Sequence, residues 1–113
     1  MAAADLTARV DKKRHPTADV LAQEVLWQAE RLREARELIK DASIVIAYDN
    51  GGGQKGIRKN PAYEAYAQLF GAFVKGMAQL DAILAEAPPE NEAARMTLDN
   101  LRVMVNDKLK VAK

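Results

Sequence analysis

The chain has 113 residues, of which 49% are apolar and 5% aromatic, and its formal net charge is +1. This length suits a single domain with a modest core, and the apolar share argues against wholesale disorder. The chain has no cysteine and a single histidine, His15, which excludes disulfides, thiolate metal sites, cysteine nucleophiles and multi-histidine metal centres.

No apolar run approaches the roughly 20 residues that a membrane-spanning helix needs. Residues 1–6 lack the basic-then-apolar pattern of a signal peptide, so we expect a soluble intracellular protein with no membrane partner. Positive charge gathers at both termini and over residues 50–63, whereas the stretches between them are acidic. This distribution permits local contacts to phosphate without predicting general affinity for nucleic acid.

The N-terminal segment, residues 1–18, shows little periodicity, and Pro16 would interrupt a helix there. We expect a flexible or loosely docked basic arm that contains Lys12, Lys13 and Arg14.

The first long helix is predicted from about residue 19 to residue 41. Its core-facing positions recur at alternating steps of four and three, which is the spacing of one helical face. Trp27 and Leu38 are interpreted as widening this stripe or flanking it. The positions of the stripe are Leu21, Val25, Gln28, Leu32, Ala35, Ile39 and Ala42.

The central segment combines glycine with positive charge between two helical patterns. It holds four of the six glycines and three basic residues, with no acidic residue after Asp49. Its sequence is Asp49-Asn50-Gly51-Gly52-Gly53-Gln54-Lys55-Gly56-Ile57-Arg58-Lys59-Asn60-Pro61.

Local signals favour a short β-hairpin in this part of the chain. Residues 43–48 hold a β-branched cluster typical of a strand, and Asn50-Gly51 is a strong tight-turn signal. Residues 54–58 would then form the return strand. An extended glycine-rich loop is the alternative.

The second long helix is predicted to begin with Asn60 as N-cap and Pro61 at the first helical position, and to end before Pro88. Gly71 and Gly76 weaken it intrinsically. They indicate either the close approach of another helix or two ordinary tolerated glycines. The apolar stripe of this helix consists of Tyr66, Phe70, Phe73, Met77, Leu80 and Leu84.

A third helix is predicted over about residues 92–109. Met96, Val103 and Met104 lie off its apolar face, so some of them are expected to stay exposed in a monomer. Amphipathic helices of this kind pack as a bundle or bury their stripes against a neighbouring subunit. The apolar face consists of Ala94, Leu98, Leu101, Val105 and Leu109.

We therefore expect a mainly α fold. Long antiparallel helices would enclose a short β-hairpin or glycine-rich loop between the first two, with the third helix at the C-terminus. Residues 1–18 would form the arm and residues 19–113 a single helical oligomerisation domain. The oligomer interface is expected at Leu32, Ile39, Tyr66, Phe70, Phe73 and Met77.

No motif predicts nucleotide binding or catalysis. A P-loop needs a lysine and a hydroxyl after its last glycine, whereas Gly56 is followed by Ile57. Gly51, Gly53 and Gly56 match G-x-G-x-x-G only in letters, because no αβ unit surrounds them. The carboxylates are scattered over helix surfaces, and His15 lies in the arm. We expect no enzymatic activity, no cofactor and no metal.

Contact with DNA or RNA phosphates is a more credible role for the basic residues. So few charges on one chain would bind weakly, but a ring that repeats them would gain avidity. The alternative is that they are solubilising charges around a turn. The candidate contacts are Lys55, Arg58 and Lys59 in the central segment and Lys12, Lys13 and Arg14 in the arm.

From Asp49 to Ala62, and more broadly over about residues 20–86, the chain resembles the small terminase subunits of tailed bacteriophages. The shared pattern is a long helix, a short β-rich glycine segment that ends in Asn60-Pro61, and a second long helix. The resemblance implies a non-catalytic component of viral genome packaging that forms homo-oligomeric rings. It also implies recognition of double-stranded viral DNA and regulation of the large terminase subunit, which carries the ATPase and nuclease.

The same resemblance implies a location in the cytoplasm of an infected or lysogenic bacterial host cell. Two features depart from the family pattern. Residues 1–18 are too short to supply a helix-turn-helix, and the segment after Pro89 differs from the usual family ending. The rival hypotheses are a helical protein–protein interaction or regulatory module without DNA binding, and a small enzyme that uses the glycine loop.

Overall fold

The computed structural model describes residues 3–43, 45–49 and 55–111, and side chains are described for these residues except 46–49, 55, 58–59 and 107–111. Across this part the chain is mainly helical, as predicted. The molecule is elongated, with extents of 62 × 25 × 24 Å. Its elements in chain order are α1 (Ala3–Leu6), α2 (Ala18–Ile39), β1 (Val45–Asp49), β2 (Lys55–Lys59), α3 (Pro61–Leu84) and α4 (Glu92–Val111).

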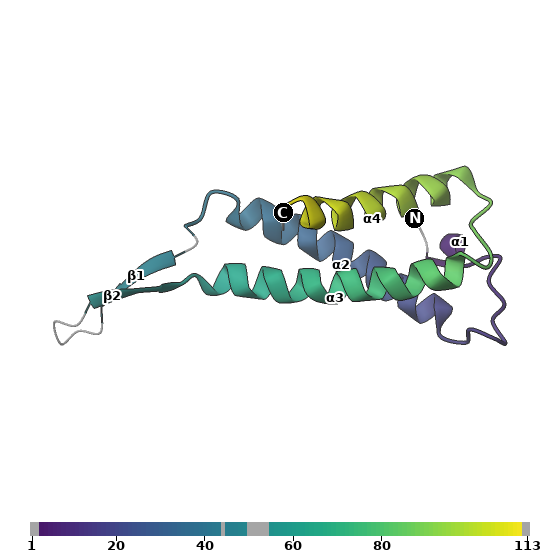
Figure 1. The fold of residues 1–113 in the computed structure, drawn as a ribbon, viewed down its shortest axis with the longest axis horizontal. Helices are drawn as coiled ribbons and strands as arrows, with labels where there is room; N and C mark the ends of the chain where they lie inside the picture. The colour runs from purple at the N-terminus through teal and green to yellow at the C-terminus, as the bar shows by residue number, and fades with distance from the viewer. Residues whose placement is uncertain (1–2, 44, 50–54, 112–113) are drawn as a thin grey trace.

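The two strands form a small antiparallel sheet at one end of the molecule, beyond the helical body (Figure 1). Val45 pairs with Lys59 at the base of the sheet, and Asp49 pairs with Lys55 at its far end. The connection over residues 50–54, which includes the predicted Asn50-Gly51 turn, lies outside the described residues.

The helical body is built on the packing of α2 against α3. α2 runs toward the sheet and α3 runs away from it (Figure 1). The two helices lie side by side along much of their length. Val25 and Leu32 of α2 and Phe73 and Met77 of α3 are at most 2% exposed, because each lies on the apolar face of its helix.

Polar side chains close the junction where the chain leaves α2 and enters α3. Asn60 is the N-cap of α3, as predicted, and its Oδ1 accepts a hydrogen bond from the Ala62 amide at 3.0 Å. Its Nδ2 donates to the Ser43 carbonyl at 2.9 Å. The Tyr63 hydroxyl donates to the Ala42 carbonyl at 2.8 Å. The start of α3 is therefore held by side-chain bonds to the residues that follow α2.

α4 folds back over the other two long helices and completes the core (Figure 1). Ala94, Leu98 and Leu101 are buried, as the predicted stripe requires. Asn91 caps the helix, because its Oδ1 accepts from the Ala93 amide at 2.8 Å. Met96 and Val103 are exposed as expected, whereas Met104 is half-buried against the core. Leu109 lies in α4, and its side chain is outside the described part.

The two glycines of α3 have different environments. A Cβ at Gly76 would lie 3.1 Å from Val25 Cγ2 and 3.7 Å from Gln28 Oε1, so α2 approaches α3 closely at this point. A Cβ at Gly71 would meet nothing within 4 Å among the described atoms. The close-approach hypothesis therefore holds for Gly76, and Gly71 is a tolerated helix glycine.

We expect Gly71→Ala to raise the free energy of unfolding by about 0.5 to 1 kcal/mol, because alanine restricts the unfolded chain and favours helix. In Gly76→Ala the same gain is opposed by the contact with Val25, so this variant should be less stable than Gly71→Ala. Urea unfolding of both proteins followed by circular dichroism measures the difference. Equal stabilisation by the two substitutions would contradict the close packing at Gly76.

Candidate functional site

The three basic residues of the central segment all lie on β2. In the strand register Arg58 pairs with Ile46 and Lys59 pairs with Val45, which places them toward the base of the sheet. Lys55 pairs with Asp49 at the far end. The side chains of Lys55, Arg58 and Lys59 lie outside the described part, so the structure locates their backbone only.

The sheet stands apart from the helical core. Ile57 is 71% exposed and Val45 is 48% exposed, although both are large apolar residues on strands. Alternation along paired strands puts these two residues on the same face of the sheet. The sheet therefore leaves two large apolar side chains uncovered, and a two-stranded sheet is marginally stable alone.

Two basic residues of the arm, Lys12 and Arg14, lie near carboxylates of the same chain. Lys12 Nζ donates to the Thr7 carbonyl and lies 3.6 Å from Asp19 Oδ1. Arg14 lies 3.0 Å from Glu86 Oε1. These two predicted phosphate contacts are therefore partly neutralised within the chain, although both residues are exposed, as is Lys13.

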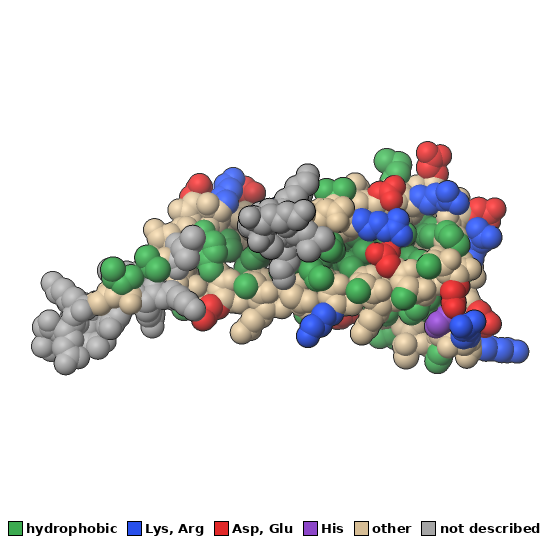
Figure 2. Space-filling view, in the orientation of Figure 1, with side chains coloured by type: hydrophobic (Ala, Val, Ile, Leu, Met, Phe, Trp, Pro, Cys, Tyr) green, Lys and Arg blue, Asp and Glu red, His purple; other side chains and the backbone are tan. Residues whose placement is uncertain are grey.

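His15 joins the same cluster at the end of α3. Its Nε2 lies 2.5 Å from Glu86 Oε2, so one carboxylate contacts both the imidazole and the Arg14 guanidinium. Acidic and basic side chains gather together at this end of the body (Figure 2). The arm end is consequently mixed in charge rather than basic.

The two predicted groups of DNA contacts lie at opposite ends of the molecule. β2 leads into the start of α3, whereas the arm contacts Glu86 just beyond its end (Figure 1). α3 has 24 residues and therefore separates the groups by about 36 Å at 1.5 Å per residue. The structure does not bring them into one site.

The segment expected to be a flexible or loosely docked arm packs into the core over its described residues. Leu6 and Thr7 are fully buried and Val10 is 6% exposed. Thr7 Oγ1 donates to Asp19 Oδ1 and contacts the Ala3 carbonyl at 3.3 Å, which satisfies the buried hydroxyl. The sequence did not predict this packing, because residues 1–18 lack the helical periodicity that marks a core-facing helix.

The six residues expected at an oligomer interface lie mostly inside one chain. Leu32, Phe73 and Met77 are at most 2% exposed, and Phe70 is 6% exposed. Ile39 and Tyr66 are half-buried, and Tyr66 packs against the core. The helical faces that carry the four buried residues meet each other across α2 and α3 within one chain. Their part in an oligomer interface stays a prediction.

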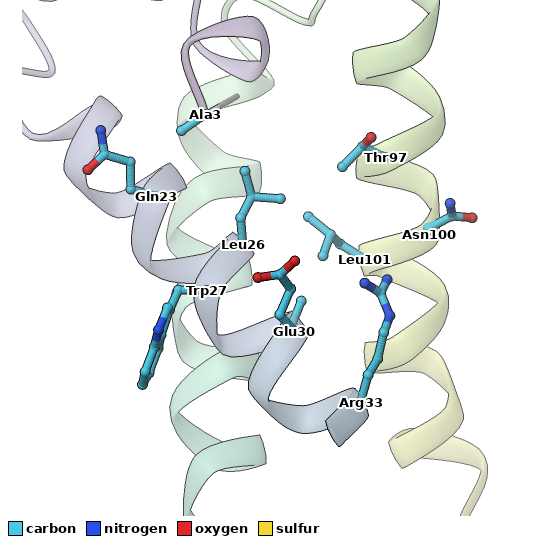
Figure 3. A pocket seen from close by; sticks show the side chains of 10 residues that line it. Ala3, Gln23, Leu26, Trp27, Glu30, Arg33, Thr97, Asn100 and Leu101 are labelled. Atoms are coloured by element: carbon cyan, nitrogen blue, oxygen red, sulfur yellow. The ribbon is translucent and has the colours of Figure 1, made fainter. Parts of the chain in front are cut away.

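An open groove of about 490 Å³ lies between α2 and α4. Leu26 and Leu101 point toward each other across it (Figure 3), and Trp27 of α2 also lines it. The polar residues at the groove are Gln23, Glu30, Arg33, Thr97 and Asn100.

Within the residues that the structure describes, no group of three or more histidine, aspartate or glutamate side chains is placed to hold a metal ion. The helices over the same residues include none with the length and apolarity needed to cross a membrane.

Sequence reasoning missed the outer face of α2. Trp27 and Leu38, interpreted as part of the core stripe or its flank, are 52% and 83% exposed, and Val20 is 66% exposed. A second helical period would have found them, because Val20 and Trp27 are seven residues apart and Val20 and Leu38 are eighteen apart.

No family model, curated protein or solved structure matches the chain.

We expect Leu6→Ala to lower the free energy of unfolding by about 2 to 4 kcal/mol, because it empties a fully buried site in the core. Lys13→Ala is the control at an exposed position of the same segment and should change stability by less than about 0.5 kcal/mol. Denaturant unfolding of the whole chain measures both. If the two variants were equally stable, the segment would be a free arm.

Proposed function

We propose that the protein is a non-catalytic DNA-packaging component of the small terminase subunit type, which self-associates, contacts viral DNA and regulates a large terminase subunit. The structural unit would be the pair of long antiparallel helices joined by the β-hairpin. Its place of action would be the cytoplasm of an infected or lysogenic bacterial cell.

The observation that carries the proposal is the position of the basic strand. Lys55, Arg58 and Lys59 belong to a sheet that extends beyond the helical body, and Asn60 continues directly into α3. The order of long helix, glycine-rich β segment, Asn60-Pro61 and long helix is the pattern shared with small terminase subunits. A projecting element can reach a DNA backbone without obstruction from the rest of the protein.

Phosphate contact through this strand would be electrostatic and independent of sequence. Three cations on one chain supply little affinity at physiological salt. Several copies held in one assembly would raise the effective concentration of the remaining contacts once the first has formed. The proposal therefore joins DNA contact to self-association, and neither is sufficient alone.

The arm contributes less in this account than the strand does. Arg14 and Lys12 each lie near a carboxylate of their own chain, at 3.0 and 3.6 Å. An assembly that contacts DNA with its sheet ends would direct the arm ends elsewhere, because the two lie at opposite ends of the body. The arm end, with its mixed charge, is then better suited to a protein surface such as the large subunit.

A second candidate function is a helical protein–protein interaction module without DNA binding. The exposed side chains of Trp27 and Leu38 favour it, because large apolar residues in line on one helix are typical of a surface that binds another helix. A small enzyme has no comparable support.

The variant Lys55→Gln/Arg58→Gln/Lys59→Gln tests DNA contact. We expect it to weaken binding to double-stranded DNA of any sequence, and to reduce the slope of log affinity against log salt by up to about 3. The matched control, Arg33→Gln/Arg36→Gln/Lys75→Gln, removes the same charge from exposed helix positions. Fluorescence anisotropy at several salt concentrations measures both.

An equal loss in the two triple variants would mean that binding follows net charge rather than the strand. Absence of DNA binding by the unaltered protein at low salt would reject the packaging role and favour the interaction module.

A further inference from the structure

The arm packs against both α2 and α4 at the end of the body away from the sheet. α1 contacts both helices, and Ala3 lies at one end of the groove between them (Figure 3). Leu6 is fully buried, and Ala3 and Val10 are at most 8% exposed. The arm therefore supplies part of the surface against which α4 packs.

Beside the arm, α2 and α4 stand apart and leave the groove of about 490 Å³ open. Ala29 lines this groove, whereas Ala18 and Ala22, two to three turns earlier on the same side of α2, are fully buried. Thr7 of the arm bonds Asp19 at this level of the helix. The arm therefore covers the side of α2 that faces the groove farther along.

α4 packs against the arm and against α3. Its buried side chains, Ala94, Leu98 and Leu101, are the apolar part of this packing. Arg102 adds a polar link to α3, because its Nε and Nη2 lie 3.1 and 3.0 Å from Asp81 Oδ1. That ion pair is largely exposed and contributes little to stability. Without the arm, α4 would lose one of the surfaces that bury its apolar side chains.

The polar bonds that fasten the arm lie on its outer side. Arg9 Nη1 donates to the Pro88 carbonyl at 3.2 Å, and Arg14 lies 3.0 Å from Glu86 Oε1. The Arg14 and Glu86 side chains are 68% and 42% exposed. Exposed ion pairs of this kind contribute little and are weakened by salt. Burial of its apolar side chains is therefore what holds the arm in place.

The arm buries little compared with the long helices. α1 has four residues, which are too few to form a stable helix in water, so its structure depends on docking. Leu6 and Val10 are its large apolar side chains in the core, whereas α2 and α3 bury a row of them along their length. Segments with few buried side chains open locally at a lower free energy than the whole chain unfolds.

We propose that the arm is a latch on α4. The arm and α4 leave the α2–α3 pair together, and this opening uncovers the apolar side of α2 from Ala18 to Ala29. In the closed state the arm and α4 limit access to that surface, so the latch controls when it can be reached. The device does not depend on the packaging role, because it uses neither β2 nor a second copy of the chain.

Two matched truncations distinguish the latch from a general loss of stability. Leu6→Ala alters the arm, and Leu80→Ala alters α3, at positions that are both fully buried. If the arm and α4 open together while α2 and α3 stay paired, Leu6→Ala makes this opening more frequent. Leu80→Ala destabilises the closed and open states alike, so it does not change how often α4 opens. Amide hydrogen exchange of the whole chain, resolved by segment, measures both.

We expect Leu6→Ala to accelerate exchange of the amides around Leu98 and Leu101 roughly tenfold or more. Leu80→Ala should leave them within about twofold of the unaltered protein while it accelerates exchange around Phe73. Val10→Ala, a smaller truncation in the arm, should act in the direction of Leu6→Ala and serves if that variant does not fold. Unchanged exchange in α4 after both arm truncations would overturn the latch. Equal acceleration of α4 by Leu6→Ala and Leu80→Ala would also overturn it, because α4 would then open only with the whole chain.

A thiol probe tests the uncovering of α2, because the chain has no cysteine of its own. Ala22→Cys places the probe at a fully buried position on the side of α2 that the arm covers. Its reaction with a water-soluble disulfide reagent should be roughly tenfold faster with Leu6→Ala and unchanged with Leu80→Ala. A probe that does not respond to Leu6→Ala would show that the opening leaves this surface covered, which would overturn the proposed control of access.

Discussion

The close packing of α2 against α3 is the contact on which the other features of this molecule depend. At Gly76 the helices approach so closely that a Cβ would lie 3.1 Å from Val25. On either side of this point Leu32, Phe73 and Met77 fill the interface. Glycine at this position lowers the intrinsic stability of the helix, but it lets the two helices approach. Closer approach adds dispersion contacts and apolar burial, which offset that loss.

This packing determines which surfaces remain for other molecules. The apolar faces of the two long helices are buried within one chain, so the surfaces open to another molecule lie outside them. α2 has exposed apolar residues on its outer side, and Val45 and Ile57 are exposed on the sheet. The order of the elements also matters, since one long helix separates the basic strand from the mixed charges around Glu86.

The features that could be predicted from the sequence are those that depend on neighbouring residues. The helical class, the start of α3 at Asn60-Pro61 and the buried face of α4 all follow from local capping and periodicity. The different roles of Gly71 and Gly76 could not be predicted, because only the partner helix distinguishes two glycines in the same helix.

Two further features could not be predicted, because local sequence patterns do not show which residues meet the core. Trp27 and Leu38 fit an amphipathic pattern, but periodicity does not say which of two apolar faces will meet the core. Leu6 and Val10 pack into the core from a segment whose sequence shows little helical periodicity. Of the candidate site, the predicted return strand over residues 54–58 included Lys55 and Arg58, and the observed β2 also includes Lys59. The contact of these residues with DNA stays a prediction.

The central claim is that the core forms within one chain, which leaves only outer surfaces for association. Amide hydrogen exchange at two protein concentrations about a hundredfold apart tests it most directly, because a core shared between subunits would open on dilution. The account predicts that amides around Val25, Leu32, Phe73 and Met77 keep the same protection at both concentrations. Protection at these residues that falls on dilution would contradict it and return them to a subunit interface.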